Sequence, residues 1–222
     1  ANCSYSSNPQ TNPLLEETIG EALQRIAATH PNQPALVVRH QNIRWTYREF
    51  LQEVDKLALG LLAMGIKPGD RVGIWAPNCV EWCLTQFATA RMGAIMVCIN
   101  PAYRLFELEY ALNKVQCRAI ITAAQFKSSD YLGMLRELAP ELDTLAADQK
   151  LQSARLPHLE FVVRMGAQQT TGMSNFDALL AQGSRQDPAA LQAIAATLKA
   201  DDAINIQFTS GTTGSPKGAT LS

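Results

Sequence analysis

The sequence predicts an α/β fold of three layers, with a mainly parallel sheet flanked by helices. Three short apolar runs, 71–76, 94–99 and 119–122, are typical of strands that are buried on both faces. Between these runs, apolar residues recur with the period of a helix. Because strands and helices alternate in this way, right-handed crossovers and a parallel sheet are expected.

Local signals at helix starts support this arrangement. Two helices are expected to begin with capping boxes, in which Thr18 pairs with Glu21 and Thr46 pairs with Glu49. Asn78 is expected to cap a third helix. The expected helices cover about 18–28, 46–65, 78–92, 105–115, 131–138, 174–182 and 188–199. The other expected strands are a hairpin at 35–39 and 43–45, followed by single strands at 159–164 and 203–208.

Composition and charge narrow the classes of function. Hydrophobic residues make up 47% of the 222 residues and charged residues 18%, which is typical of a globular protein. The formal net charge of −1 gives no reason to expect nucleic acid or an acidic membrane as a partner. No apolar run approaches the roughly 18 residues of a membrane-spanning helix, and the polar start lacks the apolar region of a signal peptide.

The cysteines do not predict a metal site. They are Cys3, Cys79, Cys83, Cys98 and Cys117. Their number is odd, their spacings are scattered, and the three histidines are not placed to complete a set of ligands. Reduced, mostly buried thiols in a cytoplasmic protein are therefore expected, and no metal-binding residue is assigned.

The stretch 209–218 carries the strongest chemical signal. It follows directly on a predicted buried strand and contains five hydroxyl residues, three glycines and one lysine. Glycines allow successive backbone N–H groups to turn inward and form an anion-binding nest. Hydroxyls and a lysine add donors and positive charge, so this stretch is predicted to bind the phosphates of a nucleotide. The predicted phosphate-binding residues are Thr209, Ser210, Gly211, Thr212, Thr213, Gly214, Ser215 and Lys217.

Two other interpretations of this stretch are less favourable. A Walker A loop requires Gly-Lys-Ser/Thr five positions after its first glycine, whereas Pro216 stands five positions after Gly211 and Gly218 follows Lys217. A flexible Ser/Gly linker would not be expected directly after a buried strand.

The stretch Thr209 to Gly218 resembles the phosphate-loop signature of the adenylate-forming superfamily, which includes acyl-CoA synthetases, luciferases and peptide-synthetase adenylation domains. Three earlier segments are similar to segments of the same family: 45–49, 65–72, and Asn100-Pro101 followed by Leu105, Glu109 and Tyr110. The sequence of residues 99–104 most resembles that of fatty-acyl-CoA ligases that prefer medium to long chains. Trp75 and Trp82 are expected to pack in the core or along a groove rather than contact substrate.

The resemblance implies an acid–thiol ligase that uses ATP, Mg²⁺ and CoA and acts on small-molecule substrates. Residues 1–15 are expected to form a flexible tail, and 16–222 the N-terminal portion of the AMP-binding domain, ending just after the phosphate loop. The C-terminal portion and the small C-terminal domain would then be absent.

The chain alone is accordingly expected to be inactive, with no catalytic residue within it. Other adenylate-forming carboxylate ligases, and a non-catalytic nucleotide-binding or interaction module, remain alternatives. The oligomeric state is left open.

Overall fold

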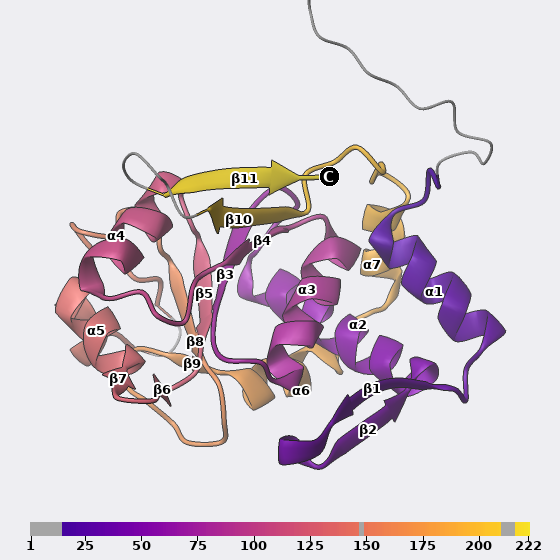
Figure 1. The fold of residues 1–222 in the computed structure, drawn as a ribbon, viewed down its shortest axis with the longest axis horizontal. Coiled ribbons are helices and arrows are strands. Elements are labelled where there is room, and N and C mark those ends of the chain that lie inside the picture. Colours follow the sequence, from indigo (N-terminus) through magenta and orange to yellow (C-terminus); the bar gives the residue numbers. More distant parts are fainter. Residues whose placement is uncertain (1–14, 147–148, 210–215) are drawn as a thin grey trace, which may run out of the picture.

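A computed structural model describes residues 15–146, 149–209 and 216–222. Its centre is a seven-stranded sheet in the order β11-β10-β4-β3-β5-β8-β9 (Figure 1). All neighbouring strands are parallel except β10 and β11, which are antiparallel. The predicted α/β class is confirmed, and the three strands from which it was predicted are adjacent in the order β4-β3-β5.

The bounds of the elements are as follows. The sheet contains β3 (Arg71–Trp75), β4 (Ile95–Cys98), β5 (Ala119–Thr122), β8 (Phe161–Arg164), β9 (Ser174–Asn175), β10 (Asn205–Thr209) and β11 (Lys217–Leu221). Two small antiparallel pairs lie outside it, β1 (Pro34–Val38) with β2 (Ile43–Thr46), and β6 (Gln125–Phe126) with β7 (Ser129–Asp130). The helices are α1 (Ile19–Thr29), α2 (Tyr47–Met64), α3 (Val80–Met92), α4 (Leu105–Lys114), α5 (Tyr131–Leu138), α6 (Phe176–Gly183) and α7 (Ala189–Ala195), with short 3₁₀ turns at Arg39–Gln41 and Pro140–Asp143.

The sheet separates two hydrophobic cores. Side chains alternate across it, so that Ile74 and Met96 enter one core while Trp75 and Val97 enter the other. Helices α1, α2, α3, α6 and α7 contribute to the first core, and α4 and α5 contribute to the second. Figure 1 shows α4 and α5 on one side of the sheet and α1, α2, α3 and α7 on the other. This arrangement explains why the strands are nearly continuous apolar runs.

Helix capping agrees with the sequence prediction at two sites and corrects it at a third. Both predicted capping boxes, at Thr18 and Thr46, are present. Asn78, however, does not cap α3. Cys79 occupies the cap position without a side-chain bond, and the first helical N–H, that of Val80, donates to Gln41 Oε1 at 2.7 Å. The free N–H group at the start of α3 is therefore bonded by a residue 39 positions earlier in the chain. A local sequence pattern could not reveal this contact.

Two predicted helices are shorter than expected. The segment predicted as a helix from Ser174 begins with strand β9, and Asn175 Oδ1 accepts from the N–H groups of Asp177 and Ala178 to start α6. The helix predicted over 188–199 spans only Ala189–Ala195.

Four cysteines lie in the described part of the chain, and all four are free thiols. Burial raises the pKa of Cys117 to about 12, and burial together with the nearby charge of Glu81 raises that of Cys79 to about 12. These two thiols therefore stay protonated at neutral pH. Cys117 is buried, whereas Cys79, Cys83 and Cys98 are half-buried, so the prediction of mostly buried thiols is correct for one of the four described cysteines. Across the described residues, no helix is both long and apolar enough to cross a membrane.

Ion pairs join the amino ends of three neighbouring strands. Arg118, just before β5, contacts Asp70 Oδ2 at 2.5 Å and Glu160 Oε2 at 2.9 Å. Lys150 contacts the same Glu160 oxygen at 2.7 Å. Although desolvation acts in the opposite direction, the hydrogen bonds from Lys150 and Arg118 hold the pKa of Glu160 below its usual value. At this edge of the sheet, the two basic side chains therefore neutralise the two carboxylates and tie the strand ends together.

Helices α2 and α6 cross at two glycines. A Cβ atom added to Gly183 would lie 1.8 Å from the carbonyl oxygen of Lys56, and one added to Gly60 would lie 2.3 Å from that of Leu179. Neither backbone oxygen can move without displacing its helix. The close approach of the two helices therefore requires glycine at both positions.

We expect Gly183→Ala to lower the free energy of unfolding by about 1–3 kcal/mol, because the added methyl group forces α6 away from α2. Chemical denaturation of the whole protein would measure this. The neighbouring exposed Ser184→Ala is the matched control, with an expected change within about 0.5 kcal/mol. Equal stability of the two variants would contradict the tight crossing.

Candidate functional site

The carboxyl ends of the parallel strands define the edge where a ligand is expected. Strands β3, β4, β5, β8 and β10 all run in the same direction, so their last residues share one edge of the sheet. Open α/β sheets bind ligands just outside this edge. Thr209, the first residue of the predicted phosphate loop, is the last residue of β10. The loop therefore starts where such a site is expected.

The loop begins and ends at paired strand positions. Thr209 lies opposite Lys217 in the antiparallel ladder of β10 and β11, and its hydroxyl donates to the Lys217 carbonyl oxygen at 3.4 Å. A P-loop of the Walker type leads from a strand into a helix. Here the chain returns as a strand, which agrees with the failed Walker spacing.

The structure brings together the two ends of the predicted site. Thr209 and Lys217 are both exposed at the base of the loop and available to a ligand. The other predicted phosphate-binding residues, Ser210, Gly211, Thr212, Thr213, Gly214 and Ser215, lie outside the described residues, and their roles stay predictions.

Two tyrosines next to the loop were not predicted as site residues. The Tyr110 hydroxyl, on α4, donates to the Pro216 carbonyl oxygen at 3.2 Å. The Tyr103 ring meets the Phe208 ring edge-on, with the centroids 6.5 Å apart. In the sequence, Tyr110 belongs only to a segment that is similar to the family. Its spacing in the sequence, 106 residues before Pro216, gives no sign of this contact.

A buried aromatic pair supports the turn that precedes α4. Trp75 and Tyr131 are fully buried and stack with ring centroids 3.6 Å apart. Trp75 Nε1 donates to the Asn100 carbonyl at 3.2 Å, and the Tyr131 hydroxyl donates to the Pro101 carbonyl at 2.6 Å. Desolvation raises the pKa of Tyr131 to about 12, so it stays a neutral donor. Trp75 is thus a core residue, as expected, and it fixes the Asn100-Pro101 turn.

Glu109, one of the residues that carried the family resemblance, forms an ion pair with Arg155. Its carboxylate accepts from Arg155 Nη2 at 2.6 Å. Glu107 instead caps the helix, since its carboxylate accepts from the Arg104 N–H at 3.1 Å. The start of α4 is therefore held by a local bond as well as by the aromatic pair.

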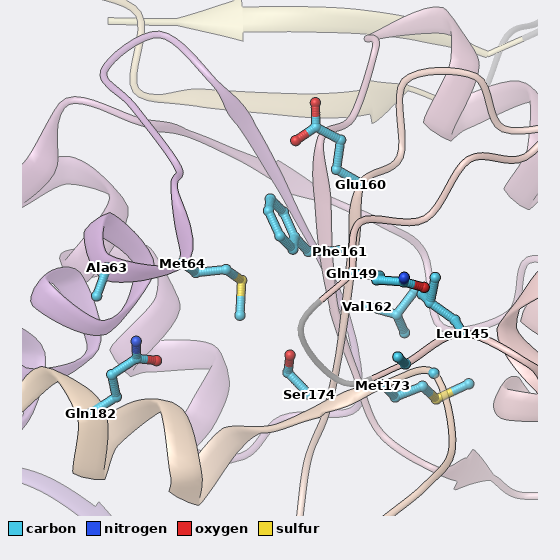
Figure 2. A pocket seen from close by; sticks show the side chains of 12 residues that line it. Ala63, Met64, Leu145, Gln149, Glu160, Phe161, Val162, Met173, Ser174 and Gln182 are labelled. Carbon is cyan, nitrogen blue, oxygen red and sulfur yellow. The ribbon is translucent and has the colours of Figure 1, made fainter.

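A hollow of about 340 Å³ lies at the far side of the sheet, near the amino end of β8 (Figure 2). Figure 2 shows Met64, Phe161 and Ser174 around it, from α2, β8 and β9. Among the described residues that line it, Glu160 alone is charged, and Arg118 and Lys150 already neutralise that carboxylate. The described lining therefore gives no reason to place the chemistry here.

Metal binding has no support within the described ranges, because no three His, Cys, Asp or Glu side chains gather there as ligands. The Mg²⁺ that the family resemblance implies is thus assigned to no residue of this part of the chain.

Comparison with known families identifies the family of this chain. Residues 23–222 match the family described as AMP-binding enzyme. The chain belongs to this family, and the resemblance to adenylate-forming enzymes noticed in the phosphate loop is confirmed.

Curated relatives are similar over nearly the whole chain. A zebrafish (Danio rerio) protein named medium-chain acyl-CoA ligase ACSF2, mitochondrial, is 48% identical over 219 residues, which are 99% of this chain and 36% of the relative. The human protein of the same name is 45% identical over 220 residues, 99% of this chain and 35% of the relative. The chain spans about a third of the length of the relatives it matches.

Solved structures share the fold. Acetoacetyl-CoA synthetase from Streptomyces lividans aligns with a TM-score of 0.73 at 25% identity, over 92% of this chain and 30% of that one. The anthranilate CoA ligase AuaEII, in complex with anthranoyl-AMP, aligns with a TM-score of 0.72 at 24% identity, over 94% of this chain and 35% of that one. The three-layer arrangement described above is thus that of adenylate-forming enzymes.

We expect Tyr131→Phe to lower the free energy of unfolding of the whole protein by about 1–3 kcal/mol, because the Pro101 carbonyl loses its donor while the ring stack remains. Thermal or denaturant unfolding would measure this. Tyr47→Phe, at a half-buried position on α2, should stay within about 0.5 kcal/mol. A Tyr131→Phe variant as stable as the wild type would show that the hydroxyl does not support the turn.

Proposed function

We propose that the whole protein is an ATP-dependent acyl-CoA synthetase that activates a fatty acid as its acyl-adenylate and transfers it to CoA. The observation that carries this proposal is the hydroxyl- and glycine-rich loop at the carboxyl end of β10, in a chain of the AMP-binding enzyme family. Its base presents Thr209 and Lys217 to solvent, at the edge where sheets of this class bind nucleotides.

The proposed reaction has two steps. In the first, a carboxylate oxygen of the acid attacks the α-phosphorus of ATP, forming a carbon–oxygen–phosphorus link and releasing pyrophosphate. In the second, the CoA thiolate attacks the acyl carbon and displaces AMP. Both steps develop charge on phosphoryl and carbonyl oxygens, so positioned donors and cations should account for most of the rate enhancement. The bound metal would screen the triphosphate charge.

The proposed substrate is a fatty acid of medium to long chain. Support comes from the sequence of residues 99–104 and from the relatives named medium-chain acyl-CoA ligase. Another carboxylic acid remains the alternative, since the similar structures include ligases named for anthranilate and acetoacetyl-CoA. The cytoplasmic location expected from the thiols stays a prediction, and the ACSF2 relatives are named mitochondrial.

We also propose that residues 16–222 are the N-terminal portion of the AMP-binding domain, since the relatives extend to about three times this length. The 222-residue chain alone should then yield no acyl-CoA above background from ATP, Mg²⁺, CoA and fatty acids.

We expect the whole protein to catalyse fatty-acid-dependent exchange of labelled pyrophosphate into ATP, with the highest kcat/KM for acids of medium to long chain. A panel of short, medium and long straight-chain acids, with anthranilate and acetoacetate included, measures this preference. Exchange with none of these acids would overturn the proposed function. Exchange with an aromatic or oxo acid alone would favour the alternative ligase.

In the whole protein, Thr213→Ala and Lys217→Ala should each slow adenylate formation by roughly 10²–10³-fold, the usual cost of losing one donor to developing charge. Charge on the leaving pyrophosphate grows as the α–β bond breaks, so these groups should act most strongly in the transition state. Pyrophosphate exchange measures kcat and KM for each substrate.

Lys199→Ala is the matched control, because Lys199 is an exposed lysine that lies before β10 and outside the loop. It should leave exchange unchanged. If the loop variants instead kept near-wild-type exchange and lost affinity for the fatty acid, the loop would belong to the acyl site.

A further inference from the structure

We propose that Tyr110 is a positioning residue for the phosphate loop, and that its hydroxyl holds the Pro216–Lys217 peptide so that Lys217 faces the departing pyrophosphate. This inference rests on the function proposed above. The contact that suggests it is the bond from the Tyr110 hydroxyl on α4 to the Pro216 carbonyl oxygen, at 3.2 Å.

The bond acts on the peptide unit that leads into Lys217. The Pro216 carbonyl and the Lys217 N–H belong to one planar group, so fixing the oxygen also fixes the orientation of that N–H. Lys217 then continues in register with Thr209 across the hairpin. The backbone of the loop's one lysine is thus held from two directions, by Tyr110 and by β10.

The same part of the chain also supports β10, the other strand of the hairpin. The Tyr103 ring packs edge-on against Phe208, one residue before the loop begins. Gly218, one residue after Lys217, faces Phe208 and Ile206, where an added Cβ would lie 3.7 and 3.1 Å from their side chains. Tyr103 therefore contacts β10 one residue before the loop, and Tyr110 contacts the residue that directly precedes β11.

Helix α4 is a rigid support for these contacts. Leu108 and Leu112 fix it in the second core, where they are 0% and 1% exposed. The Trp75–Tyr131 pair holds the turn before its first residue. In contrast, all five residues of β11 are exposed. Since β11 has little packing of its own, a bond from a helix that is anchored in the core should have a large effect on where Lys217 lies.

The size of the effect can be bounded. A displacement of about 1 Å in a group that stabilises the transition state can cost roughly 10²-fold in rate. The backbone pairing with β10 remains when the hydroxyl is lost, so the displacement should be smaller. We expect a decrease of about tenfold in kcat for adenylate formation, with the KM for the fatty acid unchanged.

The test is Tyr110→Phe in the whole protein, which removes the hydroxyl and keeps the ring. Pyrophosphate exchange is measured for the wild type, Tyr110→Phe, Lys217→Ala and the double variant. If Tyr110 acts through Lys217, its removal should cost about tenfold in the wild type and close to nothing when Lys217 is already alanine. A merely structural role would give the same loss in both backgrounds.

Tyr47→Phe is the matched control, since this half-buried tyrosine on α2 packs against the other core. It should leave exchange unchanged. Wild-type kcat in Tyr110→Phe, or an equal loss in both backgrounds, would overturn the positioning role while leaving the proposed function intact. Absence of exchange in the wild type itself would instead reject the proposed function.

Discussion

Burial of the central strands on both faces is the constraint on which the rest of the molecule depends. Because β3, β4 and β5 alternate side chains between two cores, neither face of these three strands is available for polar chemistry. Polar and charged groups are therefore concentrated at the strand ends. The amino ends hold a neutralised cluster around Arg118, whereas the carboxyl end of β10 leads into a loop of hydroxyls and glycines.

Support for that loop comes from well-packed parts of the fold. The stacked pair of Trp75 and Tyr131 binds the backbone of the turn after β4, and this turn starts α4. Helix α4 in turn binds Pro216 through Tyr110. A buried aromatic contact is thus linked, through one turn and one helix, to the base of the phosphate loop. Placing a binding loop on rigid elements in this way favours precise positioning of its donors.

Local signals in the sequence predicted most of the elements, and distant contacts account for two features that these signals missed. The capping boxes at Thr18 and Thr46 involve residues three apart, so the sequence alone was sufficient to find them. The start of α3 depends on Gln41, which lies 39 residues away, and the sequence suggested Asn78 instead. The loop was likewise recognised from its own composition, whereas Tyr110 could be connected to it only after the fold placed α4 beside β11.

The exposed strand β11 has a consequence for how two copies of this chain can meet. In the part of the chain that the structure describes, β11 is the last strand on its side of the sheet, and alternate residues direct their N–H and C=O groups away from β10. Lys217 is its one charged side chain and stands at the loop end. An uncovered edge with so little charge can template pairing with a second chain. A charged substitution near the middle of β11 should therefore oppose such pairing without disturbing either core.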